Sequence, residues 1–378
     1  MIKSSAAIVW FFLLAGFAAA QNGPASLARI AAAQLEDAHV ALTQAEGARD
    51  RVAALTQTIQ AYEAGLNALR EGLRRAAVRE TAIAREFDSE SERVSQLLGV
   101  LLNIQSNSGP LLLLHPAGPL GTARSGMIVT DMTPAFQKQA AELRTKLEEV
   151  ALLRALQESA AGSLEDGLSG VQLARTRLSQ AVSERTELPV RYLSDPLEVR
   201  RLIDSTETLD GFASGLSEID IGEEIALETQ TFTDAAGTLA LPVSGTLLRR
   251  FNESDAAGIR RPGLLIATRP LALVTTPWAA TIRYRGPLLD YGNVMILEPQ
   301  ANTLLVLTGL DQVYGEVGQV VPPDSAVGLM GGVETGANTF LLSAANGTGS
   351  EQTETLYIEI RVDGKPVDPT KWFTETKE

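Results

Sequence analysis

The sequence VAALTQTIQAYEAGLNALREGL, residues 52–73, decides the architecture of the first half of the chain. Its apolar residues recur at alternating spacings of three and four: Val52, Leu55, Ile59, Tyr62, Leu66, Leu69 and Leu73. The pattern continues to Ile104, and no proline occurs between residues 26 and 104. A sustained repeat of 3.5 residues predicts a long helix in a left-handed coiled coil.

A second run with this repeat extends from Phe136 to Val182, after Pro134. Two such segments in one chain favour an antiparallel hairpin, although a homodimeric coiled coil would also satisfy the pattern. The connector, residues 105–134, is rich in leucine, glycine and proline, which predicts an irregular tip because Gly118, Pro119 and their neighbours interrupt helices. This apolar tip either folds on itself or docks another protein.

The N-terminus carries the pattern of an export signal. One lysine, Lys3, precedes an apolar run over residues 6–20, which ends in Ala18-Ala19-Ala20 before Gln21. A basic start, a short apolar run and small residues at the end are typical of a cleaved signal peptide. A membrane anchor is the alternative, but it requires about 20 apolar residues. We therefore expect a signal at residues 1–20 and an exported, soluble mature protein in the periplasm.

The composition excludes several classes of function. The 378 residues carry a formal net charge of −14, which argues against nucleic acid as the main partner. There is no cysteine, so disulfides and thiolate chemistry are absent, and the two histidines are His39 and His115. Two histidines are too few for a metal centre rich in histidine.

A third helical stretch is expected over residues 195–216. Ser194-Asp195-Pro196 resembles an N-cap followed by proline in the first turn. Its apolar stripe includes Leu202, Leu209, Phe212 and Leu216. The stripe does not continue the heptad, so this helix either links two domains or covers a neighbouring surface. Residues 219–238 are acidic and then rich in threonine and glycine, and we interpret them as a linker that completes a segment at 191–238.

From residue 239 onward, short β-type runs alternate with turns. The expected strands cover residues 264–267, 272–275, 281–284, 293–298, 303–307, 318–321 and 355–362. The fold class predicted for the chain is therefore α + β and multidomain: a long antiparallel coiled-coil hairpin at 21–190, the helical segment at 191–238 and a small antiparallel β domain at 239–378.

An ordered set of motifs in this β domain resembles the LytM, or lysostaphin-type, endopeptidase family. The set is Leu241-Pro242-Val243-Ser244-Gly245, Gly263, Tyr291-Gly292-Asn293-Val294, Val317-Gly318, Gly328-Leu329-Met330-Gly331-Gly332, Leu356-Tyr357-Ile358-Glu359-Ile360-Arg361 and Val367-Asp368-Pro369. The resemblance covers residues 239–373. It implies the fold of a small zinc peptidase.

The resemblance also implies where zinc ligands would stand, and those ligands are missing. Active members use H-x-G-x-D, a Y-A-H-L segment and H-x-H. Here the corresponding positions hold Arg261, Leu265, Gly309, Thr355 and Tyr357. Zinc requires three protein donors of N, O or S type, whereas arginine has no acceptor and leucine has no donor atom. We therefore expect no metal, no cofactor and no hydrolysis by this domain.

An export signal, a coiled coil and a metal-less LytM domain together resemble the EnvC-like murein hydrolase activators. That resemblance implies a non-enzymatic periplasmic protein that activates a cell-wall amidase during division. It implies that the coiled-coil tip contacts an FtsX-like membrane complex of the FtsEX type. It further implies that a helical regulatory arm, carrying the stripe at 202–216, occludes the LytM groove until that complex engages.

The candidate residues for the amidase-binding groove are Arg261, Tyr291, Tyr357, Glu359 and Arg361. Tyrosine and arginine are common anchors in interfaces, although Glu359 could equally be solvated and Tyr291 could pack in a turn. A periplasmic scaffold that binds peptidoglycan in this groove, without amidase activation, is the alternative. An efflux-pump adaptor is disfavoured because helical sequence begins directly after the signal.

Overall fold

The structure is a computed structural model that describes residues 24–106, 118–185, 188–190, 196–218, 231–255, 258–336, 339–340 and 352–374. The expected signal peptide at 1–20 and His115 lie outside these ranges. The chain divides into two compact units. One comprises residues 1–68, 166–336 and 350–378, and the other comprises residues 69–165 and 337–349. Within the described ranges, no helix combines the length and apolarity needed to cross a membrane.

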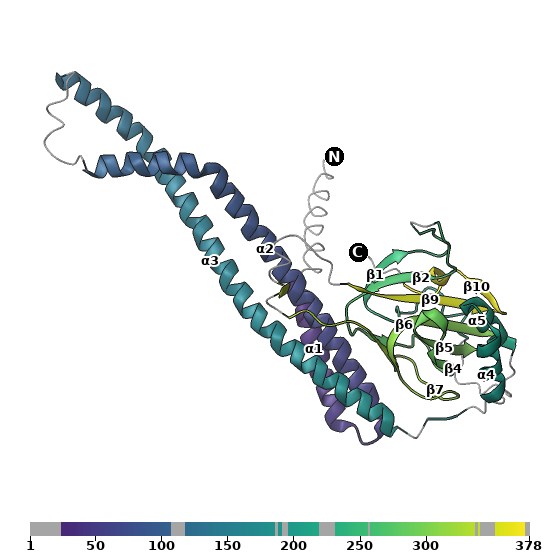
Figure 1. Ribbon diagram of the computed structural model, residues 1–378. Helices are drawn as coiled ribbons and strands as arrows, with labels where there is room; N and C mark the ends of the chain where they lie inside the picture. The colour runs from purple at the N-terminus through teal and green to yellow at the C-terminus, as the bar shows by residue number, and fades with distance from the viewer. Residues whose placement is uncertain are drawn as a thin grey trace, which may run out of the picture. The chain divides into compact units, whose positions relative to one another are not determined.

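The described residues of the first half of the chain form the helices α1 (Pro24–Gln44), α2 (Ala48–Ser106) and α3 (Gly118–Glu184) (Figure 1). The continuous helix expected from residue 26 to 104 is therefore wrong at its start, because the chain turns at residues 45–47. Gly47 lies in this turn, and glycine disfavours helix by about 1 kcal/mol relative to alanine. Helix α1 then lies against α2, since a Cβ added at Gly65 would sit 3.5 Å from that of Ala31.

Helices α2 and α3 run antiparallel where they touch. In the first unit, the Tyr62 ring lies against Gly170. In the second unit, Glu80 accepts a hydrogen bond from Arg154 at 2.8 Å, and Glu86 accepts one from Lys146 at 2.6 Å. The contacting residues on α3 thus have falling residue numbers as those on α2 rise, which is the pattern of an antiparallel pair. The apolar residues of the repeat that are buried include Val52, Leu55, Ile59, Leu66, Leu73 and Ile83 on α2 and Leu164, Leu168, Val171 and Leu178 on α3.

The irregular tip expected over residues 105–134 is too long. Helix α3 already begins at Gly118 and contains Pro134, while residues 107–117 lie outside the described ranges. Pro119 is tolerated because it falls in the first helical turn, where its missing N–H needs no partner. Pro134 removes one backbone hydrogen bond, but its ring is exposed on a helix 67 residues long.

The C-terminal region is an antiparallel sheet with the path β1-β2-β9-β6-β5-β4-β7, which β3, β8 and β10 extend. The 3₁₀ turns η3 (Leu289–Tyr291) and η4 (Pro369–Lys371) accompany it. The seven expected strands are all present, and β1, β8 and β10 were not expected. The strands are β1 (Gly245–Arg249), β2 (Leu264–Thr268), β3 (Leu273–Thr275), β4 (Ala280–Pro287), β5 (Asn293–Gln300), β6 (Thr303–Val313), β7 (Val320–Val321), β8 (Ala326–Met330), β9 (Glu354–Val362) and β10 (Lys365–Val367).

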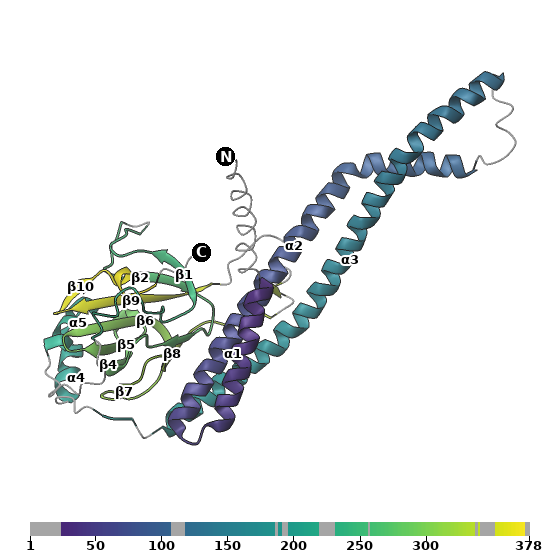
Figure 2. The same ribbon diagram turned by 180° about the vertical axis from the view of Figure 1, so that it is seen from behind.

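The two faces of this sheet carry separate apolar cores because successive side chains of a strand point to opposite faces. On β9, Leu356 and Ile358 join one core, which also holds Phe232 and Trp372. Tyr357 joins the other. Two helices, α4 (Pro196–Ser205) and α5 (Leu209–Glu218), contribute to this second core (Figure 2).

The single helix expected over residues 195–216 is thus two helices. The break falls at residues 206–208, where the Thr208 hydroxyl accepts a hydrogen bond from the Gly211 backbone N–H at 3.0 Å. A threonine oxygen that satisfies a free N–H favours the start of a new helix.

A buried ionic cluster joins α2, α3 and the sheet within the first unit. The Glu63 carboxylate accepts hydrogen bonds from the Leu273 backbone N–H at 3.0 Å and from Arg175 at 3.2 Å. Arg175 also donates to Glu334 at 3.1 Å. The side chains of Arg175 and Glu63 are 8% and 12% exposed. Burial raises the pKa of Glu63 to about 7, although the Arg175 charge opposes the rise.

Candidate functional site

Strand pairing brings together the positions at which the family resemblance would place zinc ligands. Leu265 on β2 lies directly opposite Tyr357 on β9. On the other side of β9, Thr308 of β6 pairs with Tyr357. The next residue, Gly309, has a φ of 95°, and a Cβ there would overlap the Thr355 carbonyl oxygen. Segments far apart in the sequence therefore converge on one region of the sheet.

The side chains at these positions do not fit a zinc ion. Arg261 is a permanent cation, and Leu265 and Gly309 offer no side-chain donor. Tyr357 offers a phenol whose pKa is raised by burial and by the nearby Glu359 charge, so it resists the deprotonation that a strong ligand needs. Across the described residues, no group of three or more His, Cys, Asp or Glu side chains could hold a metal ion.

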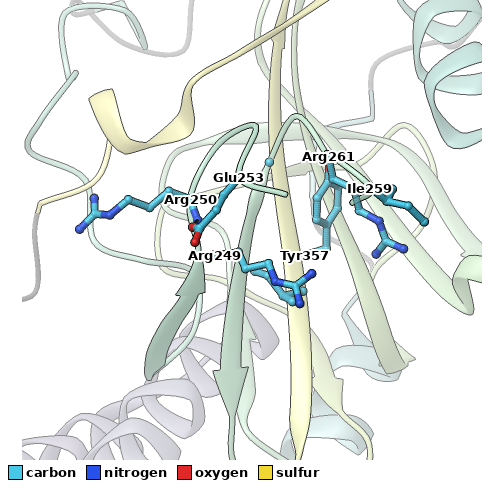
Figure 3. A pocket seen from close by; sticks show the side chains of 8 residues that line it. Arg249, Arg250, Glu253, Ile259, Arg261 and Tyr357 are labelled. Atoms are coloured by element: carbon cyan, nitrogen blue, oxygen red, sulfur yellow. Dashed lines mark hydrogen bonds between the residues drawn. The ribbon is translucent and has the colours of Figure 1, made fainter. Parts of the chain in front are cut away.

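A small pocket lies over these positions. It has a volume of about 20 Å³, and its lining includes Arg249, Arg250, Arg261, Leu265 and Tyr357. In the view of Figure 3, Tyr357 lies between the Arg249 and Arg261 side chains. A pocket of this size holds a group about as large as a water molecule. The chemistry on offer is therefore three arginine side chains and the Glu253 carboxylate beside an apolar and phenolic floor.

A line of polar side chains continues from this pocket along β9. The Tyr357 hydroxyl donates to Glu359 Oε2 at 2.7 Å, and Arg361 Nη1 donates to Glu359 Oε1 at 2.6 Å. Tyr357, Glu359 and Arg361 are 8%, 4% and 1% exposed. Burial raises the pKa of Glu359, while the Tyr357 hydrogen bond and the Arg361 charge counteract that rise. Such a buried, hydrogen-bonded line is costly to disrupt one member at a time.

Helix α5 completes this network from the face of the sheet on which it packs. Arg361 donates to Asp210 and Ser214 of α5, both at 2.7 Å, and to the Gly364 carbonyl at 2.7 Å. Arg283, on β4, donates to the Leu216 carbonyl at 2.9 Å. Cationic donors favour helix C-termini because the last carbonyls have no partner within the helix. Two buried arginines of the sheet therefore hold α5: Arg361 near its start and middle, and Arg283 near its end.

Apolar contacts reinforce the docking of α5. Leu209, Phe212 and Leu216 are 5%, 0% and 1% exposed, and they pack into one core with Tyr284 and Val306 of the sheet. The Phe212 and Tyr284 rings meet edge to face, with centroids 4.9 Å apart at 72°. Leu202 of α4 is partly buried against the same core. All four residues expected in the regulatory arm therefore pack on the sheet face that bears Tyr357.

The five groove candidates fall into three environments. Arg261 and Tyr357 line the small pocket, whereas Glu359 and Arg361 are enclosed in the network beneath α5. Tyr291, in η3, is 37% exposed. Sequence reasoning missed Asp210, Ser214 and Arg283. Their signal is weak: the first two stand four residues apart within an apolar stripe, and Arg283 interrupts the apolar run of β4.

No family model matches this chain. Among curated proteins, it is similar to an uncharacterized protein of Neisseria meningitidis serogroup B, with 25% identity over 142 residues, which is 38% of this chain and 21% of that protein. It is also similar to an uncharacterized protein of Haemophilus influenzae, with 28% identity over 134 residues, 35% of this chain and 29% of that protein. The chain thus spans less than a third of the length of these relatives.

Solved structures similar to this chain include three described as peptidases. A candidate peptidase M23 of Pseudomonas aeruginosa has 16% identity and a TM-score of 0.31, covering 49% of this chain and 64% of that one. A zinc-containing peptidase of Vibrio cholerae has 20% identity and a TM-score of 0.28, covering 35% and 39%. The catalytic domain of lysostaphin from Staphylococcus simulans has 15% identity and a TM-score of 0.26, covering 33% and 89%.

Proposed function

We propose that this chain is a non-enzymatic periplasmic activator of a peptidoglycan amidase in cell division. The chain combines a helical N-terminal region with an antiparallel β domain. In the proposal, residues 1–20 direct export, and α2 and α3 act as a long coiled-coil hairpin. The end of that hairpin, near residues 105–134, engages an FtsX-like membrane complex. The β domain binds the amidase, through the sheet face that α5 covers and the pocket beside it.

The observation that carries this proposal is the docking of α5 on the polar line of β9. The covered residues, Tyr357, Glu359 and Arg361, belong to the motif that resembles the zinc-binding strand of LytM peptidases, and their polar groups are engaged with one another and with α5. A partner that used these side chains would have to displace α5 first. This supports an autoinhibited binding domain rather than an enzyme.

The chemistry of the α5 interface suits a reversible switch. A helix tethered to its own binding face has a high effective concentration, so a modest intrinsic affinity keeps the face closed. Opening then requires a second partner that binds the open form more tightly than the closed form. In the proposal, the membrane complex is that second partner, and the amidase supplies a segment that replaces α5.

A dye-release assay on purified murein tests the proposal. The full chain would be measured alone and with each periplasmic amidase of the same organism, with and without a chelator. The proposal expects no release by the chain alone and faster release by at least one amidase in its presence. Chelator-sensitive release by the chain alone would show that it is a hydrolase. No stimulation of any amidase, together with retention on murein, would favour the peptidoglycan-binding scaffold.

A further inference from the structure

The part of the helical hairpin that belongs to the first unit meets the sheet through charged groups. This part, called the helical base below, comprises residues 48–68 of α2 and 166–184 of α3. Among the described residues, the two apolar cores of the sheet contain no residue of the helical base. The buried cluster of Glu63, Arg175 and Glu334 does join the base to the sheet. A contact made by ionisable groups depends on which of those groups carry a charge.

The cluster holds two carboxyl groups and one cation. Arg175 donates from Nη2 to Glu63 Oε1 at 3.2 Å and from Nη1 to Glu334 Oε2 at 3.1 Å. The side chains of Glu63, Arg175 and Glu334 are 12%, 8% and 8% exposed. With both carboxyls ionised, this buried group would carry one uncompensated negative charge, which is strongly unfavourable away from water. A single proton on one carboxyl removes that charge.

Glu63 is placed to hold this proton. The Leu273 backbone N–H, at the start of β3, also donates to Glu63 Oε1, at 3.0 Å. Both hydrogen bonds thus end on the same oxygen, so Oε2 can carry a proton while both persist. Burial raises the pKa of Glu63 to about 7, and the Glu334 charge adds to this rise, while the Arg175 charge opposes it.

The other groups around the cluster leave Glu63 to respond to pH near neutrality. Arg175 is a permanent cation. Tyr314, which follows β6 and is 6% exposed, feels the Arg175 charge, but burial raises the pKa of its phenol to about 12. Strand β3 presents the Leu273 backbone N–H. Helix α1 also packs on α2, and its His39 lines a cavity beside Tyr62 on that side of the helix.

We propose that this cluster is a proton-dependent latch between the helical base and the β domain. With a proton on Glu63, one cation faces one anion and the base stays docked on β3 and on the segment after β8. Loss of the proton leaves two anions on one cation, and the base is released into water, where Glu63 is hydrated. The proposal concerns two parts of this chain, so it does not depend on amidase activation.

The direction of the pH effect follows from the raised pKa. The docked form binds a proton that the released form, with Glu63 at its ordinary pKa of 4.5, has lost above that pH. Docking is therefore strongest below about pH 4.5 and weakens as the pH rises to about 7. The ratio of released to docked chain should rise about 10-fold per pH unit in this window, roughly 300-fold in all, and then level off.

Distances between two spin labels on the full chain test the latch. The chain contains no cysteine, so Ser179→Cys on α3 and Ala301→Cys in the turn between β5 and β6, both at exposed positions, take one label each. Double electron–electron resonance then records the distance distribution from pH 5 to 8. Glu63→Gln fixes the neutral form, and His39→Gln controls for titration of a histidine in the same pH range. Circular dichroism at each pH verifies that the helices and strands stay folded.

The latch predicts a second, broader set of distances that grows from pH 5 to about 7 and is constant above. Glu63→Gln should keep the docked distance at every pH, whereas His39→Gln should respond as the parent chain does. A distance distribution in the parent that does not change between pH 5 and 8 would overturn the proposal. The same pH response in Glu63→Gln, or its loss in His39→Gln, would also overturn it.

Discussion

Replacement of Phe212 by alanine should open the α5 interface. The Phe212 ring is fully buried and meets the Tyr284 ring edge to face at 4.9 Å. Removal of a buried phenylalanine costs about 3–5 kcal/mol, and alanine returns a few tenths of a kcal/mol as the better helix former. Since about 1.4 kcal/mol corresponds to a factor of ten, the equilibrium for undocking of α5 should rise by roughly 10²- to 10³-fold.

Two measurements follow this change. Hydrogen exchange of the backbone amides of residues 209–218 should accelerate by a similar factor, because exchange reports local opening. In the dye-release assay, the chain concentration that gives half-maximal amidase stimulation should fall, because the apparent affinity is the intrinsic affinity scaled by the open fraction. The gain ends once the open form predominates.

Leu156→Ala is the matched control, since Leu156 on α3 is 55% exposed and its loss should change neither readout. Unchanged protection of residues 209–218 in Phe212→Ala would show that the packing argument is wrong. Faster exchange with weaker amidase stimulation would show that α5 assists binding rather than blocks it.

Three further predictions concern single buried groups. Glu63→Gln removes a carboxyl whose pKa is about 7 in the folded chain and 4.5 in its ordinary state. Because the folded form binds the extra proton between these values, the unfolding free energy of the parent chain should fall by about 3 kcal/mol relative to this variant as the pH rises through that window. Urea unfolding from pH 4 to 8 measures this difference. Arg361→Ala leaves Glu359 buried without its cation and should cost about 3–5 kcal/mol of unfolding free energy, with Arg361→Lys intermediate; equal stability of all three chains would contradict the network. Gly309→Ala, at φ 95°, should lower the unfolding free energy by about 2 kcal/mol or more, whereas Gly162→Ala, with open space around it on α3, should raise it by about 1 kcal/mol.

The heptad pattern predicted the long helices because burial of a sustained apolar stripe dominates their stability. It could not place the turn at residues 45–47, where a single glycine decides between one helix and two. The glycine and proline content also extends the predicted irregular tip over residues 118–134, because it indicates a helix break regardless of position in a helix. Pro119 shows that the position within a helix decides the cost of proline.

The β strands were predicted well where apolar runs are buried on both faces, as in β5 and β6. The sequence pattern did not predict strand β1, because three of its five residues are exposed at an edge, where the apolar signal is weakest. The convergence of Leu265, Gly309 and Tyr357 follows from strand pairing, which sequence spacing alone does not give. The ion pair of Arg361 with Asp210 and its hydrogen bond to Ser214 could not be predicted either, because they join residues about 150 positions apart.

A removable covalent lock on α5 tests the central claim most directly. The chain contains no cysteine, so a pair introduced by Ser217→Cys and Gly364→Cys would form its only disulfide. A Cβ at Gly364 would lie 3.3 Å from the Ser217 hydroxyl oxygen, which is close enough for such a bond, although a side chain at its φ of 73° adds backbone strain of about 1–3 kcal/mol. The pair would be built into the Phe212→Ala chain, and Ser217→Cys alone would serve as the control.

Amidase-driven dye release would be measured before and after reduction with a phosphine. Autoinhibition predicts that the oxidised chain leaves the amidase at its basal rate and that reduction restores full stimulation, while the control responds to neither treatment. Full stimulation by the oxidised chain would contradict the claim that α5 must leave the sheet face before the partner binds.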